Sequence, residues 1–290
     1  MISKRDFQVT TLGTRPRVLV PVLKGQMARP AISIGDALLT LPGASGSLLA
    51  LVEVPAGPTR GLVAQDDRWR DMLRWVAGLD YGPDLLRRLK VTLRLTADVA
   101  SSIRDAIAET RATSLVLEWP TITSPRRHRL SVLTDQLLDD PATDVMFVRS
   151  DPKAPSREIA PRSILAPIRG GPSARFVAST AAALADAFAS KLTLLHVQTE
   201  SQHPDRSRRE WATFEQIVEQ LHRPSTVVRM RHDDSPEAGI AEEVAGHDLL
   251  IIGSRQDPLR PKALVGRALM RVVRRLERAV VVVRPKPVGS

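Results

Sequence analysis

The chain carries the apolar stretch Ser163-Ile-Leu-Ala-Pro-Ile168 and an earlier copy of it, Arg17-Val-Leu-Val-Pro-Val22. Each is a short apolar run with proline at the same place, which is typical of a buried parallel strand. Four further strand-like runs follow each copy in the same order. These runs and their later counterparts are 48–54 and 192–197, 91–95 and 226–230, 114–118 and 248–252, and 144–149 and 279–284. The offset drifts only from about 146 to 134 residues, so we interpret the sequence as an internal duplication.

Helical patterns lie between the strand-like runs. Apolar side chains share one helix face in 176–188 and in 264–276, and shorter patterns occupy 103–107 and 240–245. Strands that alternate with helices imply βαβ units and a parallel sheet. We therefore expect an α/β fold made of two repeated, doubly wound, Rossmann-like domains, each a five-stranded sheet flanked by helices.

The expected domain boundaries follow from the repeat. The first domain occupies residues 1–150 and the second occupies residues 162–290. Between them, residues 151–161 are rich in proline and polar side chains, which is typical of a linker.

The composition excludes several classes of chemistry. The 290-residue chain has no cysteine, which rules out disulfides, thiolate zinc sites, iron–sulfur clusters and thiol nucleophiles. No apolar run approaches the ~20 residues that a membrane helix needs. The segment Met1 to Thr14 lacks the apolar core of a secretory signal. We expect a cytoplasmic chain without a transmembrane segment, associated with a membrane only through a partner.

Positive charge is concentrated at the end of the chain. The formal net charge is +10, and residues 253–290 alone contain ten basic and two acidic side chains, net +8. Arginines mark the polar side of the last helical pattern, and they are compatible with a docking surface or with an ordinary solvated face. Aromatic residues make up only 3% of the chain, which leaves little material for base stacking, so we expect no nucleic-acid partner.

Five pieces of the second half carry a family resemblance. They are Ile164-Leu-Ala-Pro-Ile168, Leu194-Leu-His-Val197, His247-Asp-Leu-Leu-Ile-Ile-Gly-Ser254, Val265-Gly266 and Val280-Val-Val-Val-Arg-Pro285. In this order and spacing they resemble the universal stress protein family. With the duplication, the chain resembles the tandem two-domain form over nearly all of residues 16–286.

The resemblance implies where a ligand would bind. The family contains ATP-binding and non-ATP-binding branches. Binding members share a G-x2-G-x9-G-[ST] loop after the fourth strand and an Asp just after the first strand. Glycines would let backbone N–H groups curl around phosphates, at φ angles that other residues resist. The following helix N-terminus adds partial positive charge, and the Asp accepts hydrogen bonds from the nucleoside.

The second half keeps only part of this pattern. Gly253 holds the first glycine position and Gly266 is in register, but Gln256 stands where the second glycine belongs. Arg267 replaces the hydroxyl residue, and Arg169 stands at the Asp position, which reverses the charge. The candidate phosphate or nucleotide site comprises Pro167, Ile168, Arg169, Gly253, Ser254, Arg255, Gly266 and Arg267.

Two hypotheses about the ligand of this site remain. The lost Asp and hydroxyl indicate that ordinary ATP binding has been lost and that no cofactor is needed. The arginines at 169, 255 and 267 could instead converge on an anion, because Arg forms bidentate bonds to phosphate. ATP or another phosphate-bearing ligand in the second domain therefore remains an alternative.

The first half departs further from the pattern. Trp119 is aligned with the first glycine, Leu23 stands in place of the Asp, and residues 124–130 contain no glycine. A bulky indole would fill a phosphate cradle. We expect the first half not to bind nucleotide.

The remaining candidate residues favour structural roles. His196, at the end of a strand-like run, is expected to be a core histidine, because one His without a nucleophile or orienting partner makes no site. His232-Asp233-Asp234 fits no standard metal-ligand spacing. The sequence shows no phosphate-binding P-loop, dinucleotide fingerprint, G-x-S-x-G or paired carboxylates. We expect no catalytic residue, no metal site and no enzymatic activity.

The expected function is that of a regulatory or interaction module related to stress or signalling. In the universal stress protein family, which the chain resembles, the last strands of two domains commonly meet across a dimer interface. That resemblance implies an intramolecular pseudo-dimer with Val145, Phe147, Val280 and Val282 in the contact. One alternative is a sensor of nucleotides or other anions. Another is a cytosolic regulatory domain of a membrane transporter, of the amino-acid permease or cation antiporter type, with that transporter or another protein as partner.

Overall fold

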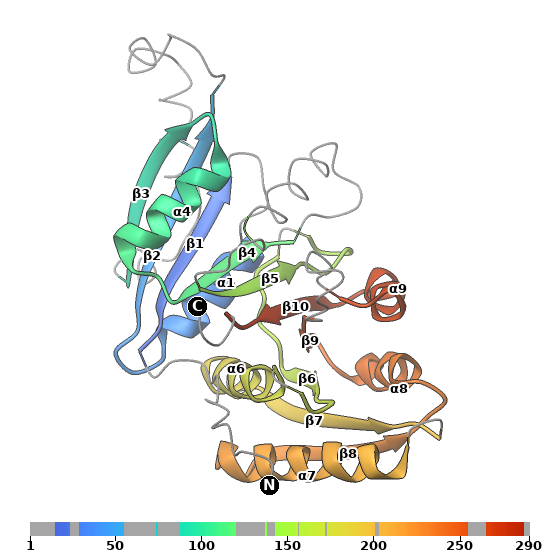
Figure 1. Ribbon diagram of the computed structural model, residues 1–290. Helices are drawn as coiled ribbons and strands as arrows, with labels where there is room; N and C mark the ends of the chain where they lie inside the picture. Colours follow the sequence, from blue (N-terminus) through green and yellow to red (C-terminus); the bar gives the residue numbers. More distant parts are fainter. Residues whose placement is uncertain are drawn as a thin grey trace, which may run out of the picture.

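The computed structural model describes residues 15–23, 29–54, 74, 88–119, 137, 143–155, 157–171, 173–200, 203–254 and 265–286. Within them, ten strands form one sheet in the order β3-β2-β1-β4-β5-β10-β9-β6-β7-β8 (Figure 1). The strands are β1 (Arg17–Leu23), β2 (Ser45–Glu53), β3 (Leu89–Thr96), β4 (Ser114–Glu118), β5 (Asp144–Arg149), β6 (Ser163–Pro167), β7 (Lys191–Gln198), β8 (Thr226–His232), β9 (Leu249–Gly253) and β10 (Ala279–Arg284). The helices are α1 (Arg29–Leu39), α4 (Val99–Thr110), α6 (Ala174–Ala187), α7 (Pro204–Leu221), α8 (Pro236–Glu243) and α9 (Arg267–Arg275), with a 3₁₀ turn, η3 (Val244–Gly246).

The doubly wound α/β prediction is confirmed. Within each half the neighbouring strands are parallel and follow the same order, third-second-first-fourth-fifth. The strand bounds agree with the expected ones to within three residues. Short, apolar, fully buried runs leave little freedom for where a central strand begins and ends.

Two helices of the described chain, α1 and α7, were not predicted. In α1, nine of eleven residues are buried, so apolar residues occur nearly all round the helix. In α7 most side chains are charged or polar, and only Phe214 and Ile217 are fully buried. The apolar residues of α7 nevertheless recur at helical spacing on one face that packs on the core, a signal in the sequence that was overlooked: they are Trp211, Phe214, Ile217, Val218 and Leu221.

Helices cover both faces of the sheet and create two apolar layers. One layer contains side chains from α1, α6 and α7 together with alternate strand residues such as Val20 and Ile164. The other contains side chains from α4, α8 and α9 with the intervening strand residues, such as Leu19 and Leu165. Each layer includes residues of both halves of the chain, so the two halves share their core on both faces.

The two halves meet at an antiparallel strand pair in the middle of the sheet. The paired residues are Val145–Arg284, Met146–Val283, Phe147–Val282, Val148–Val281 and Arg149–Val280. Val145, Phe147, Val280 and Val282 are each at most 1% exposed. Strand pairing here covers what would otherwise be an exposed apolar edge of each half.

Polar contacts reinforce this seam. The Arg149 guanidinium, on β5, donates to the carbonyl oxygens of Val273, of Leu276 and of Arg278 at 3.1 Å, and so caps the end of α9. Arg is suited to this position because a cation favours the C-terminus of a helix. The terminal helix of the second half is therefore held by a side chain of the first.

The segment predicted as a linker packs onto the protein. Ile159 is 7% exposed and belongs to the layer formed with α1 and α6. Its backbone N–H donates to the Ser33 hydroxyl at 3.2 Å. In the described part of the chain, no helix combines the length and the apolar character required to cross a bilayer.

Candidate functional site

Each half of the sheet has one place where the strand order reverses. These places lie between β1 and β4 and between β6 and β9. In open α/β sheets ligands bind beyond the carboxyl ends of the strands at such a switch point. The β6–β9 pairing extends over only two residue pairs, Ile164–Leu249 and Leu165–Leu250, so it ends before the strands reach their carboxyl ends. The predicted site residues come from these ends and from the start of α9.

The end of β6 turns sharply into α6. The Ile168 N–H donates to the Leu195 carbonyl at 2.8 Å, which holds the end of this strand against β7. Arg169 is exposed. Gly170 and Gly171 follow at φ +75° and +122°, conformations that L side chains rarely adopt. Sequence reasoning did not single out this glycine pair, although Gly-Gly directly after a buried strand signals a tight turn.

Gly253, at the end of β9, is closely packed against the start of α6. A Cβ there would lie 3.0 Å from Val177 Cγ2 and 3.1 Å from Ser173 Oγ, at the start of α6. Neither Gly253 nor Gly266 has a positive φ. In this structure neither glycine uses the left-handed conformations that distinguish glycine from other residues. Among the described glycines of the second half, those with a positive φ are Gly170 and Gly171, in the turn after β6.

Ser254 offers a hydroxyl at the same end of the sheet. Its backbone N–H donates to the Val283 carbonyl at 2.8 Å, which continues the β9–β10 pairing. Its side chain is 5% exposed, and Oγ has no hydrogen-bond partner among the described residues. A buried hydroxyl without a partner is energetically costly, so this group is available to a ligand or to a neighbouring loop. Arg255 lies outside the described residues.

The start of α9 has no side-chain cap from its N-cap residue. Gly266 is the N-cap residue at φ −58°, and it makes no side-chain capping bond. The first turn of α9 contains no acidic residue. An uncapped helix N-terminus carries free N–H groups and partial positive charge, which favour an anion. Arg267 is the first residue of the helix, and its side chain is outside the described part of the structure.

The structure corrects the alignment of the first half. The Trp119 N–H donates to Val148, as the Ser254 N–H donates to Val283. Val148 pairs with Glu118, and Val283 pairs with Gly253. Glu118, not Trp119, is therefore the counterpart of Gly253, and Trp119 is the counterpart of Ser254. The error arose because the repeat was aligned one residue out of register in this strand, which similar apolar residues cannot reveal.

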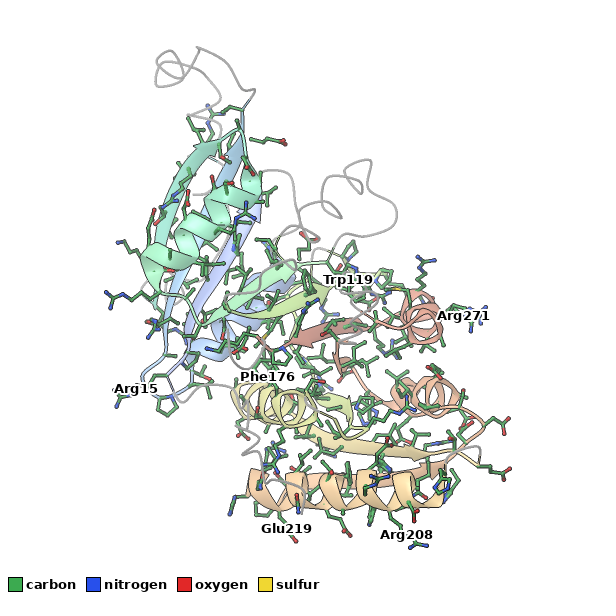
Figure 2. The ribbon with its side chains drawn as sticks, in the orientation of Figure 1. Arg15, Trp119, Phe176, Arg208, Glu219 and Arg271 are labelled. Atoms are coloured by element: carbon green, nitrogen blue, oxygen red, sulfur yellow. The ribbon has the colours of Figure 1, made fainter. Side chains whose placement is uncertain are left out.

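Glu118 places a carboxyl group at the switch point of the first half. Its Oε2 atom is buried and has no partner among the described residues. Burial raises its pKa to about 7, since desolvation disfavours the ionised form. Trp119, the next residue, packs partly buried against the layer formed with α4, α8 and α9 (Figure 2). When it is ionised, a carboxylate here repels phosphate.

His196 helps to fix the end of β6, next to the candidate site. It is fully buried, and its Nδ1 lies 3.0 Å from the Ile168 carbonyl oxygen, next to Arg169. Its ring packs 5.6 Å from that of Trp211 and 5.4 Å from that of Phe214, measured between centroids. The histidine therefore braces the end of β6. In the described ranges no group of three His, Cys, Asp or Glu side chains could hold a metal ion.

Comparison with known proteins places this arrangement in context. Residues 161–284 match the model of the universal stress protein family. No curated protein matches the sequence.

Solved structures resemble the chain over most of its length, and three of them illustrate the likeness. A universal stress protein from Archaeoglobus fulgidus DSM 4304 superimposes with a TM-score of 0.60 at 12% identity, covering 93% of this chain and 97% of that one. A protein of unknown function from Pseudomonas aeruginosa PAO1 gives a TM-score of 0.57 at 13% identity, covering 93% of each chain. The cytoplasmic domain of a prokaryotic cation chloride cotransporter gives 0.56 at 11% identity, covering 93% of this chain and 95% of that one. At these identities the likeness shows a shared fold over both halves.

Proposed function

Because residues 161–284 carry a universal stress protein domain, we propose that the chain is a non-catalytic regulatory module that has lost ordinary ATP binding. The observation that carries this proposal is the chemistry at the two switch points. In the second half, Arg169 stands where ATP-binding relatives have an acidic acceptor. In the first half, Glu118 stands where they have the first glycine.

Arg169 cannot replace the acidic residue. A guanidinium has five N–H donors and no acceptor, so it cannot receive hydrogen bonds from nucleoside hydroxyl groups. Its side chain is exposed at the end of β6. The second half therefore retains a strand end and a helix N-terminus suited to phosphate but lacks the group that would recognise the nucleoside.

Glu118 argues against a ligand in the first half more strongly than an indole would. Its carboxyl stands at the position of Gly253, where backbone and phosphate would need to approach each other. Whether neutral or ionised, it adds bulk to this position, and above its raised pKa it also adds negative charge. We infer that the first half contributes structure and surface rather than binding.

A second candidate function is an anion sensor in the second half. Three features support it: the Ser254 hydroxyl, which has no partner among the described residues, the start of α9, which has no side-chain cap from Gly266, and the exposed Arg169. Together they supply donors and positive charge but no carboxylate, which suits an inorganic or organic phosphate.

A third candidate function is the cytoplasmic part of a transport system. The shared fold with a cotransporter's cytoplasmic domain extends over 93% of this chain. The net charge of +8 in residues 253–290 suits a location near an acidic partner or membrane. In this reading the transporter would be a partner of the chain.

Isothermal calorimetry distinguishes these functions. The purified chain is titrated with ATP, AMP and tripolyphosphate at low and moderate salt. We expect no saturable ATP binding at moderate salt. Tripolyphosphate binding as tight as that of ATP would favour the anion sensor. Saturable ATP binding that survives moderate salt and disappears in Gly266→Trp would overturn the proposal.

A charge-reversal variant sharpens this test. Arg169→Asp restores an acidic acceptor at the end of β6, so it should strengthen ATP binding relative to tripolyphosphate binding. Arg208→Asp is the matched control, because Arg208 is an exposed arginine on α7 with a side chain 81% exposed. An equal effect of both variants would mean that only net charge matters.

A further inference from the structure

The last strand of the sheet, β8, has a free edge. Among the described strands it pairs only with β7, in parallel, over the seven residue pairs from Leu192–Thr226 to Gln198–His232. No described strand lies beyond it, so the described sheet does not use its outer N–H and C=O groups. Natural sheets usually protect such an edge with lysine, proline, a bulge or a covering element, because a free edge invites another strand.

Exposed apolar side chains gather at this edge. In the described part of the chain, the exposed large hydrophobic residues are Val227 at 43%, Val228 at 44%, Met230 at 41% and Val91 at 37%. Three of the four belong to β8, and Val91 belongs to β3 at the opposite edge. A cluster of exposed apolar side chains on a strand edge marks an interaction surface.

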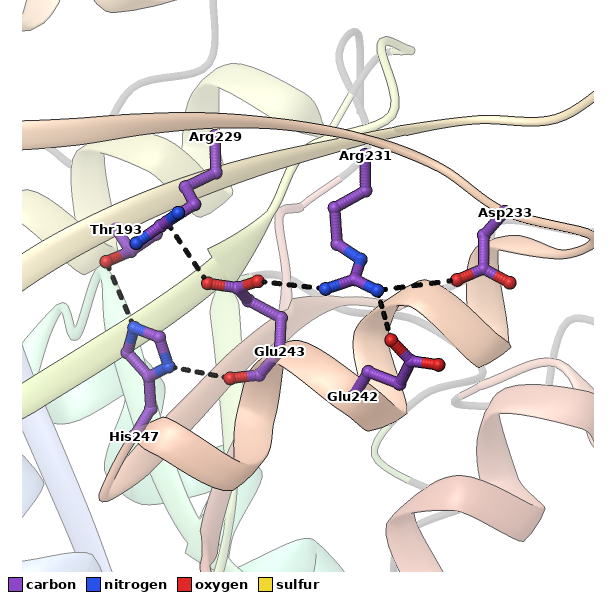
Figure 3. A network of polar contacts seen from close by, with 7 residues as sticks. All are labelled: Thr193, Arg229, Arg231, Asp233, Glu242, Glu243 and His247. Carbon is purple, nitrogen blue, oxygen red and sulfur yellow. Dashed lines mark hydrogen bonds and ion pairs between the residues drawn. The ribbon is translucent and has the colours of Figure 1, made fainter.

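The arginines of β8 are already neutralised by their own domain. Figure 3 shows Arg229 and Arg231 pointing from the strand toward acidic side chains of α8 and of the preceding turn. Arg229 Nε lies 3.3 Å from Glu243 Oε1, and Arg231 bonds Glu242 and lies 3.5 Å from Glu243 Oε2 and 3.9 Å from Asp233. These two cations face three carboxylates, so the edge has no surplus positive charge with which to recruit an acidic peptide.

The sequence of β8 is complementary to itself. In an antiparallel pair of two β8 strands centred on Arg229, Val228 of each chain lies opposite Met230 of the other chain. The two-fold axis therefore creates this apolar contact two times. Val228 and Met230 share the strand face that points away from the arginines, because side chains alternate. Directly opposed apolar residues stabilise an antiparallel pair. The same arrangement places Arg229 against its symmetry mate, with each copy held by its own Glu243.

We propose that β8 is a homodimerisation edge, at which two copies of the chain pair their β8 strands antiparallel about a two-fold axis at Arg229. The interface is isologous and closed, so it joins two chains and no more. It continues the sheet from one chain into the other. The opposite edge is less suited to this, since residues 92–95 of β3 are half-buried.

The first test measures association of the full chain by sedimentation equilibrium between about 1 μM and about 1 mM. A monomer–dimer equilibrium is expected. Val228→Lys should raise the dissociation constant by at least about tenfold, because it places a charge in the apolar contact. Val91→Lys is the matched control at the other edge and should leave the constant unchanged. Far-ultraviolet circular dichroism and the thermal midpoint verify that each variant is folded.

The second test determines the register. Because the chain has no cysteine, a single introduced cysteine reports one contact. Arg229→Cys should form an intermolecular disulfide on mild oxidation. Val228→Cys and Met230→Cys should cross-link to each other when mixed but not to themselves, since disulfides require Cβ atoms about 4 Å apart.

Four outcomes overturn the proposal. The first is a strictly monomeric chain throughout the concentration range. The second is an equal effect of Val228→Lys and Val91→Lys. The third is faster cross-linking of Val228→Cys or Met230→Cys to itself than to the other, which indicates a different register. The fourth is cross-linking of Val91→Cys to Val228→Cys with open-ended growth, which indicates head-to-tail pairing of the two edges.

Discussion

At the scale of single residues, the two halves differ most at one pair of equivalent positions. Gly253 is small because α6 begins so close to β9 that a Cβ would crowd Val177 and Ser173. Its counterpart Glu118 is a carboxylic acid whose Oε2 is buried without a partner among the described residues. The two copies therefore differ at this position: the second half has a glycine that fits close packing, and the first half has a carboxyl group whose ionisation lowers stability.

Glu118 makes stability depend on pH. Burial raises its pKa to about 7, above the value of 4.5 expected without burial. The unfolded chain therefore ionises this group more readily, so stability falls as pH rises from about 4.5 to about 7. We expect Glu118→Gln to be more stable than the parent above pH 7 by on the order of 3 kcal/mol. Below pH 4.5 the two should be nearly equal.

Urea unfolding at a series of pH values measures this difference. Glu158→Gln is the control, because Glu158 is exposed, and it should follow the parent at every pH. If the advantage of Glu118→Gln did not change with pH, the carboxyl would not titrate differently in the folded chain.

At the scale of elements, the turn from β6 to α6 positions the candidate site. It holds Arg169 at the strand end, while His196 braces the preceding residue, Ile168. Gly170 and Gly171 carry the backbone through left-handed conformations. The position of Arg169 thus depends on a turn in which two residues adopt positive φ angles that favour glycine.

Gly171→Ala should destabilise the chain by about 1–2 kcal/mol, because alanine resists a positive φ. A Cβ at Gly171 would meet nothing within 4 Å, so the cost comes from the backbone alone. Gly246→Ala is the matched control: its Cβ also meets nothing within 4 Å, and its φ is not positive. Chemical denaturation should place that control within about 0.5 kcal/mol of the parent. Equal losses in both variants would contradict this account of the turn.

Strands were easier to predict than helices or register. The central strands are continuous apolar runs, and each duplicated copy supports the other. Helix α1 is buried on nearly every side, which obscures its pattern, whereas the apolar face of α7 is present in the sequence and was overlooked. The one-residue error at Trp119 arose because hydrophobicity alone cannot align two apolar runs, whereas backbone hydrogen bonds can.

At the scale of the whole molecule, one sheet and two shared apolar layers join the halves. The pairing of β5 with β10 lies at the centre of the sheet, and Arg149 ties it to α9. A continuous core of this kind favours cooperative unfolding of both halves together.

Phe147 reports on this cooperativity, because it is fully buried at the seam and pairs with Val282. Phe147→Ala should lower the stability of the entire chain by about 3–5 kcal/mol through loss of packing and a cavity. Scanning calorimetry should show one transition that shifts as a whole. Val91→Ala, at the partly exposed edge, should shift it little. Two separate transitions, of which only one moves, would show that the halves unfold independently.

The sequence by itself determined the α/β class, the duplication and the strand positions. These follow from local composition and periodicity, which act over a few residues. Only the tertiary structure decided that Glu118 is the counterpart of Gly253, that Ser254 has a buried hydroxyl without a partner in the described chain, and that β8 is the edge strand of the described sheet and carries exposed apolar side chains. Those facts depend on which strands pair, in which register and under what cover, and such long-range contacts leave no local pattern in the chain.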